Sequence, residues 1–429
     1  MGPTHSNARR RSRQRIFVAA VFAWLALTAL SCSTGQPALQ SPPAAGSGDA
    51  LRVLFLGNSY TYYHNLPRLV EEFAAAANRK IATGMIAPGG ASLANHLANQ
   101  RVLDTIRTGR WNFVVLQEQS QLGAVYLVNG APRVANPDAF FVATRALDAE
   151  IRKAGAKTVL YHTWPRRDAP DSDRAMLDYA YHRIARDLNA TVAPAGLAWQ
   201  QARAELPGAS LYDPDGSHPS RTGSYLAAAV IFATLTGASP VGGPARISGS
   251  PVHPASGVAP ENLTVLVDLP ARFAGELQRI AWQTHEKLVA AGGSLDPPAP
   301  PPLALPQVPS GARPKPEDLT GRWLGTLQFY PQPATLELWI AEKKDKPGEW
   351  TAAIEVRFPS GNQEKFTHEL EQFQITAAGV SFVDPSGPNG GIVRYRAAFT
   401  SGKLTGVAEA IVTDAPIYAI GSFELKRIQ

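Results

Sequence analysis

Residues 51–293 alternate between short apolar runs and longer stretches in which apolar side chains recur at helical spacing. The run Leu51–Leu56 (LRVLFL) has the composition of a buried parallel strand, and residues 66–78 show the helical spacing. The same patterns predict strands over residues 80–86, 112–116 and 158–161, and helices over residues 138–154, 173–188 and 220–237. Strands separated by helices of this length predict an α/β fold with a parallel sheet and helices on both faces.

Residues 318–429 follow a different pattern, in which short alternating runs are separated by Gly, Pro, Asn and Asp. Because helical periodicity is largely absent, we expect a C-terminal antiparallel β-sandwich or barrel. The segments 321–325 and 421–427 open and close this region, so its first and last strands are candidates to pair. Prolines are dense over residues 294–317, which we interpret as an extended linker between domains 51–293 and 318–429.

The N-terminus has the features of an export signal. Five arginines precede an apolar run over residues 16–30, which is too short for a comfortable membrane span. The sequence LTALSC ends at Cys32, the only cysteine, and resembles a bacterial lipobox, although Ala29 stands where Leu is usual. We therefore expect a signal peptide over residues 1–31, an acylated Cys32 and a flexible tether over residues 32–50. The chain is then an exported, membrane-anchored lipoprotein of a bacterial envelope, and a secreted or periplasmic protein is the alternative.

The net charge of +6 does not indicate nucleic-acid binding. Five of these charges belong to the arginines of the first 31 residues, which hold no acid, so the rest of the chain is near +1 (6 − 5). A nucleic-acid site needs basic residues clustered on a folded face, and the sequence offers no such cluster. With one cysteine the chain cannot form an internal disulfide, so packing alone must hold the domains together.

Three residues have the chemistry of a nucleophile with its base. Ser59 lies in a Gly-Asn-Ser turn directly after the first predicted strand, where it would be exposed to substrate beside backbone N–H groups. A serine alone is a weak nucleophile and needs an adjacent base. Asp215 and His218 lie late in the domain, and a carboxylate at this spacing can hold one imidazole nitrogen while the other accepts the serine proton. Ser59, His218 and Asp215 are the predicted catalytic residues, and Asp213 is the alternative partner of the histidine.

With these motifs the chain resembles the SGNH/GDSL hydrolase superfamily over most of residues 51–237. The first block of that family, usually Gly-Asp-Ser, is the Gly-Asn-Ser that ends at Ser59, and the glycine of the second block matches Gly90. The last block, Asp-x-x-His, matches Asp215 and His218. The resemblance implies a flavodoxin-like α/β/α sandwich and ester hydrolysis through an acyl-enzyme. It also implies an oxyanion hole built from the backbone N–H groups of Ser59 and Gly90 and a side-chain amide.

The third block departs from the family pattern. Members usually show Gly-x-Asn-Asp, whose Asn supplies the amide, whereas this chain has Gln117-Glu118-Gln119-Ser120. Position by position, Gln119 replaces the Asn with the same carboxamide one methylene longer, so Gln119 is the predicted oxyanion donor and Gln117 the alternative. Another interpretation is that one glutamine only braces the Ser59 turn. We expect Glu118 to be solvated or paired with an arginine, and a position facing the site is the alternative.

Asn58 and Trp164 are candidate substrate contacts. Trp164 follows another predicted strand, and its ring could stack against a sugar or an acyl group, although packing is the commoner use of tryptophan. His64, His96 and His162 lack metal-ligand spacing and no cluster of Cys or acids joins them, so we expect neither a metal nor a cofactor.

These features predict an exported serine esterase that acts on small-acyl esters, with the O-acetyl groups of carbohydrates as the expected substrate class. The alternative is a non-catalytic, ligand-binding envelope lipoprotein built on a degenerate hydrolase fold. The partner of the C-terminal β domain stays open, since a ligand, a protein or a spacer role would suit the sequence equally.

Overall fold

The computed structural model describes residues 50–252, 263–329, 332–357, 365–387, 391–412 and 417–428. These residues form two compact units. The first unit holds residues 50–123 and 134–301, and the second holds residues 124–133 together with the chain from residue 302 onward. The predicted signal peptide, Cys32 and the tether up to residue 49 lie outside the described residues and stay predictions.

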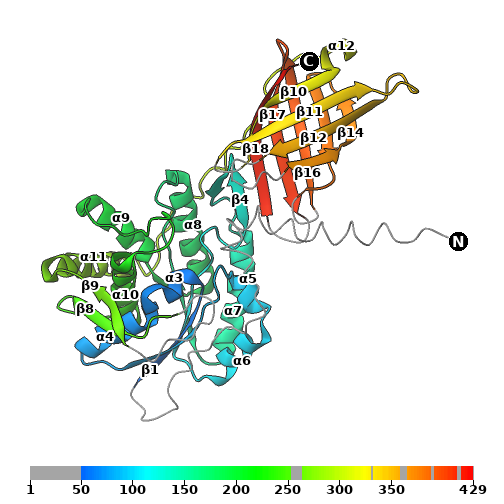
Figure 1. The fold of residues 1–429 in the computed structure, drawn as a ribbon. Coiled ribbons are helices and arrows are strands. Elements are labelled where there is room, and N and C mark those ends of the chain that lie inside the picture. Colours follow the sequence, from blue (N-terminus) through cyan, green and yellow to red (C-terminus); the bar gives the residue numbers. More distant parts are fainter. Residues whose placement is uncertain are drawn as a thin grey trace. The chain divides into compact units, whose positions relative to one another are not determined.

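The first unit is built on a five-stranded parallel sheet in the order β2-β1-β3-β6-β7. Helices surround this sheet (Figure 1). In the central register, Leu54 pairs with Gly84 on one side and with Val114 on the other. This order is that of a doubly wound, flavodoxin-like sheet, so the predicted α/β/α class is confirmed. The strands are β1 (Leu51–Leu56), β2 (Ile81–Ile86), β3 (Phe113–Leu116), β6 (Lys157–Tyr161) and β7 (Thr191–Ala193).

Helices cover both faces of this sheet because alternate side chains of each strand point to opposite sides. Val53 and Phe55 belong to one apolar cluster, and Leu54 and Leu56 belong to the other. The first cluster includes residues of α4 (Leu66–Ala76), α9 (Ala195–Glu205), α10 (Arg221–Thr236) and α11 (Ala271–Ala290). The second includes residues of α5 (Leu93–Leu97), α6 (Gln100–Thr108), α7 (Asp138–Lys153) and α8 (Asp171–Leu188). A two-stranded antiparallel sheet, β8 (Arg246–Gly249) with β9 (Thr264–Asp268), completes the unit.

Helix α10 fixes the position of the loop that precedes it. The hydroxyl of Ser220 accepts the backbone N–H of Gly223 at 3.2 Å and so caps the helix. A Cβ at Gly223 would lie 2.3 Å from the carbonyl oxygen of Leu211 and 2.5 Å from the ring of Trp199. Glycine therefore lets the first turn of α10 lie directly against the chain that leads into the Asp215–His218 loop.

The second unit is an antiparallel sheet in the order β13-β12-β11-β10-β18-β17-β16-β15-β14. Strands β10 and β18, which come first and last along this region of the sequence, pair with each other, as expected from the sequence. Strands β12 and β14 lie against each other near the two ends of the sheet, so it nearly closes into a barrel. The predicted antiparallel β class is confirmed. The elements are α12 (Pro316–Leu319), β10 (Gly321–Gln328), β11 (Ala334–Glu342), β12 (Trp350–Arg357), β13 (Lys365–Glu369), β14 (Glu371–Ile375), β15 (Gly379–Asp384), β16 (Ile392–Thr400), β17 (Lys403–Val412) and β18 (Ile417–Arg427).

This second unit also takes in a hairpin from the middle of the chain, which the sequence did not predict. The hairpin consists of β4 (Val125–Val128) and β5 (Ala131–Arg133), and β4 pairs in parallel with the first half of β18. Strand β10 pairs with the second half of β18, so the hairpin continues the sheet where β10 ends. Across the described part of the chain, no helix has the length and apolar character needed to span a membrane.

Candidate active site

Ser59 lies at the carboxyl end of β1, the edge at which ligands bind to sheets of this kind. It is the first residue of α3 (Ser59–Tyr62), which is followed by the 3-10 turn η1 (Tyr63–Asn65). The side chain of Asn58 caps α3, because its Oδ1 accepts the backbone N–H of Tyr60 at 3.0 Å. Its Nδ2 donates to the carbonyl oxygen of Ala91 at 2.9 Å, so both ends of this buried amide are engaged within the protein.

Gln117, at the end of β3, braces the Ser59 turn. Its Oε1 accepts the backbone N–H of Asn58 and the hydroxyl of Thr61, both at 2.9 Å, and its Nε2 donates to the carbonyl of Glu118 at 2.6 Å. The side chain is fully buried. A Cβ at Gly57 would lie 2.5 Å from this Oε1, so glycine is required for the glutamine to approach the turn. These contacts match the interpretation in which one glutamine supports the turn.

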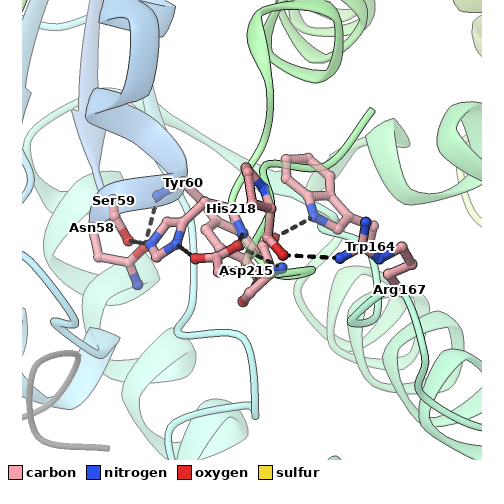
Figure 2. A network of polar contacts seen from close by, with 9 residues as sticks. Asn58, Ser59, Tyr60, Trp164, Arg167, Asp215 and His218 are labelled. Carbon is pink, nitrogen blue, oxygen red and sulfur yellow. Dashed lines mark hydrogen bonds and ion pairs between the residues drawn. The ribbon is translucent and has the colours of Figure 1, made fainter. Parts of the chain in front are cut away.

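The structure brings Ser59, His218 and Asp215 into one chain of hydrogen bonds (Figure 2). The Nε2 of His218 lies 2.8 Å from the Oγ of Ser59, and its Nδ1 contacts Oδ2 of Asp215. The other carboxylate oxygen of Asp215 accepts the backbone N–H groups of Ser217 and His218, both at 2.9 Å. Partial burial raises the pKa of Asp215, but the hydrogen bonds from His218 and Ser217 outweigh it and hold that pKa below its usual value. The carboxylate is therefore ionised where it meets the imidazole.

Asp213, the alternative partner, contacts His218 through the backbone. Its N–H donates to the carbonyl oxygen of His218 at 2.9 Å, whereas the imidazole ring itself contacts Asp215. Burial first, and the charge of Asp215 second, raise the pKa of Asp213. The geometry thus favours Asp215 over Asp213 as the residue that orients the imidazole.

Aromatic side chains support the loop that carries His218. The hydroxyl of Tyr60 lies 2.7 Å from Ser217 Oγ, and the indole N–H of Trp164 donates to the carbonyl of Ser217 at 3.1 Å. The ring of Trp164 stacks between Tyr60 and Trp199, with centroids 5.0 Å and 3.6 Å away. Trp164 is 0% exposed. Its ring therefore serves packing in this structure, the alternative to the expected substrate contact.

Gly90 lies in the loop after β2, next to the Ser59 turn. Its φ of +70° is in the left-handed region, which favours glycine. The neighbouring carbonyl of Ala91 accepts the Asn58 side chain, and this bond ties the Gly90 loop to the nucleophile turn. Gln119 lies in the loop after β3, where its Oε1 accepts the N–H of Gln121 at 2.7 Å and its Nε2 makes only a long, 3.4 Å contact with Ser120.

The expectation for Glu118 was wrong, because among the described residues its carboxyl is neither solvated nor paired with an arginine. It is 0% exposed, and its carboxyl accepts the backbone N–H groups of Leu93, at 3.1 and 3.2 Å, and of Gln119. Burial raises the pKa of Glu118 to about 8, against the opposing effect of these hydrogen bonds. The carboxyl thus joins the start of α5, which follows the Gly90 loop, to the Gln119 loop.

No role in the site was expected from the sequence for His96, Tyr60, Tyr63 or Ser217. His96 is buried, its Nε2 contacts the carbonyl oxygen of Gly57 at 2.8 Å, and burial lowers its pKa to about 4, so the ring is neutral. The position of Tyr60 and Ser217, each next to a predicted catalytic residue, was the one signal available.

In the part of the chain that the structure describes, no group of three or more His, Cys, Asp or Glu residues could hold a metal ion.

Comparison with known proteins finds similarity to solved structures only. A DUF4886 family protein from Bacteroides uniformis is 19% identical, with a TM-score of 0.43, over 58% of this chain and 98% of its own. A protein from Parabacteroides merdae described as a GDSL-like lipase is 16% identical, with a TM-score of 0.35, over 46% of this chain and 99% of its own. An acetylxylan esterase from Geobacillus stearothermophilus is 15% identical, with a TM-score of 0.36, over 45% and 96%.

No family model and no curated protein matches the chain. Of these three structures, one bears a GDSL-type name, one is named an acetylxylan esterase and one carries a family number only. At these identities the likeness concerns the fold, and the function proposed below rests on the geometry of the site.

Proposed function

We propose that the first unit is a serine hydrolase that cleaves ester bonds through an acyl-enzyme. The observation that carries the proposal is the 2.8 Å contact between Ser59 Oγ and His218 Nε2, in a ring whose Nδ1 meets an ionised Asp215. A hydroxyl, an imidazole and a carboxylate joined in this order form the general arrangement of a serine nucleophile with its base.

Each group then has a defined role in two half-reactions. His218 accepts the Ser59 proton as the Oγ attacks the ester carbonyl, and it donates that proton to the leaving alkoxide. A water molecule then attacks the acyl carbon and gives a proton to His218. The imidazolium returns that proton to the Ser59 oxygen as the carboxylic acid leaves. Asp215 holds the tautomer of the imidazole and stabilises the imidazolium that forms in both half-reactions.

The oxyanion is proposed to bind the backbone N–H groups of Ser59 and Gly90 and the amide of Gln119. Support comes from the 2.9 Å bond between Asn58 and Ala91, which joins the Ser59 and Gly90 loops. Gln117 is the less suitable donor, because its amide oxygen and nitrogen are both engaged in bracing the turn. The amide of Gln119 makes only the long contact with Ser120.

Small-acyl esters, and O-acetyl groups of carbohydrates among them, are the proposed substrates. The enzyme would meet them as an exported lipoprotein anchored through Cys32, a location supported by the arginine-rich start and the lipobox-like sequence. The sequence also offers no evident hydrophobic lid segment of the kind a long-chain lipase needs. An acyl-length series of p-nitrophenyl esters, together with acetylated glycans, tests this part separately.

A fluorophosphonate probe tests the reaction class directly. We expect covalent labelling of the wild-type protein and none of Ser59→Ala, while Ser59→Ala also loses hydrolysis of p-nitrophenyl acetate and keeps its melting temperature. Ser239→Ala, which removes an exposed serine, is the matched control and should label like the wild type. Absence of labelling in the wild type would favour the ligand-binding alternative, and equal labelling of Ser59→Ala would assign the nucleophile elsewhere.

A further inference from the structure

The ring of Tyr63 lies flat against the imidazole of His218. The two centroids are 4.5 Å apart and the planes differ by 10°, while Tyr60 meets the same imidazole edge-on at 5.7 Å and 73°. Ser59 and Asp215 contact the two ring nitrogens in the plane of the ring. Tyr63 therefore covers a face of the imidazole, a direction that neither of these hydrogen bonds controls.

The backbone after Tyr63 adopts an unusual conformation that is held in place by side chains. His64 and Asn65 are consecutive non-glycine residues with φ of +52° and +48°, in the left-handed region that such residues rarely enter. His64 Nδ1 lies 2.9 Å from Ser224 Oγ on α10, and Asn65 Nδ2 donates to the carbonyl of Ser250 at 2.9 Å. These bonds to distant segments hold the turn that presents Tyr63 to His218.

An aromatic ring interacts more favourably with the protonated form of a histidine stacked on its face than with the neutral form. The π-electrons attract a cation within about 6 Å of the ring centroid, whereas a neutral imidazole gains only packing. In the proposed reaction His218 is neutral in the resting enzyme and becomes an imidazolium in each half-reaction. A ring at 4.5 Å thus binds the charged form, and with it the transition state, more tightly than the ground state.

The charged groups around His218 are consistent with such a role. Asp215 contacts the ring at Nδ1, and Asp213 also interacts electrostatically with His218. Burial, followed by the charges of Asp213 and Asp215, raises the pKa of the Tyr63 phenol, so the ring over the histidine stays uncharged. His64 is also neutral, because burial and then the charge of Arg221 lower its pKa to about 4.

We propose that Tyr63 is a positioning residue for the reaction: its ring fixes the plane of the His218 imidazole and stabilises the imidazolium during acyl transfer. This inference rests on the proposed function and extends it to a residue outside the Ser59–His218–Asp215 set. The phenol hydroxyl has no part in it, so the aromatic face alone must account for the effect.

Variants at position 63 separate the ring from its hydroxyl and from simple packing. Tyr63→Phe should keep kcat within about threefold of the wild type, whereas Tyr63→Leu should lower kcat about tenfold with little change in KM. The acid limb of the kcat/KM profile of Tyr63→Leu should move to lower pH, because the protonated histidine has lost its stabilising face. Equal losses in both variants, or a Tyr63→Leu profile identical to that of the wild type, would overturn the proposal.

A second pair of variants holds the shape constant in case Tyr63→Leu folds poorly. Replacement of Tyr63 by phenylalanine and by 4-cyanophenylalanine, which withdraws electrons from the ring, changes the π-face with little change in packing. We expect kcat to fall from the first to the second, and equal values would contradict the inference. Fluorophosphonate labelling of the wild type distinguishes failure of the proposed function from failure of the inference about Tyr63. If the wild type does not label, the proposed function is refuted. If it labels and the variants at position 63 keep an unchanged kcat, only the role of Tyr63 is refuted.

Discussion

The hydroxyl of Tyr60 lies 2.7 Å from the hydroxyl of Ser217, and these two residues are the direct neighbours of Ser59 and His218 in sequence. Residues 157 positions apart are thus joined beside the predicted nucleophile and base. Both side chains are buried, so the bond is protected from competition with water. It fixes the serine turn relative to the histidine loop independently of the bond between Ser59 and His218 themselves.

Removing this bond should impair the alignment of the two loops. For Tyr60→Phe and for Ser217→Ala we expect a kcat that is three- to tenfold lower. Each variant should also lose about 0.5–1.5 kcal/mol of unfolding free energy, because it removes one hydroxyl and leaves the other buried without this partner. The double variant should cost little more than either single one, because both remove the same interaction. Additive losses in the double-mutant cycle would show that the hydroxyls act separately.

Asp215 and Asp213 provide a matched pair for testing which carboxylate orients His218. Asp215→Asn should lower kcat about 10³- to 10⁴-fold, because an amide at Nδ1 favours the wrong tautomer. Asp213→Asn should stay within about threefold of the wild type, since its contact with His218 is made by the backbone N–H. Steady-state hydrolysis of p-nitrophenyl acetate measures both, and the reverse ranking would reassign the partner.

The two glutamines after β3 should fail in different ways. Gln119→Ala should lower kcat about 10²-fold and leave the melting temperature near that of the wild type, as expected for loss of an oxyanion donor. Gln117→Ala should instead lower the unfolding free energy by about 1–3 kcal/mol, because the N–H of Asn58 and the hydroxyl of Thr61 lose their buried acceptor. A large kcat effect for a stable Gln117→Ala, with none for Gln119→Ala, would exchange the two roles.

Glu118 should make stability depend on pH in the range 4.5 to 8. Its pKa rises from 4.5 to about 8 on folding, chiefly through burial, so below pH 4.5 the group is protonated in both states. Between these values the unfolded chain releases a proton that the folded chain keeps, and the free energy of unfolding falls by up to about 5 kcal/mol. Above pH 8 that loss is complete.

Glu118→Gln removes this titration and nearly keeps the shape of the side chain. The stability of the variant relative to the wild type should therefore increase steadily from pH 5 to pH 8, measured by urea unfolding at several pH values. A difference that stays constant across this range would show that the Glu118 carboxyl does not titrate abnormally.

Elements with strong periodicity were predictable from the sequence almost to the residue. Residues 138–154 and 220–237 were expected as helices and are α7 and α10, which differ from those bounds by one residue at one end or at both. The short helices α5 and α6 and the three-residue strand β7 lack enough turns or alternations to produce a pattern. Their structure depends on the sheet against which they pack.

Within the site, residues at the ends of strands were predictable and their supporting contacts were not. Ser59 and His218 could be paired because parallel strands deliver their carboxyl ends to one edge of the sheet. The buried position of Glu118 depends on a bond from the backbone of Leu93, 25 residues earlier. The stacking of Tyr63 depends on a left-handed turn that side-chain hydrogen bonds tie to α10 and to a later segment. Neither contact leaves a periodic trace in the local sequence.

The β4–β5 hairpin has a consequence for the order in which the chain can fold as it is synthesised. Asn129 accepts bonds from the N–H and hydroxyl of Ser422, a separation of 293 residues, and β4 pairs with residues 417–420. The ribosome therefore releases the hairpin long before the strand that completes it exists. During that interval β4 has an open edge, a known site of wrong pairing, and it takes its place in the sheet only when β18 has emerged.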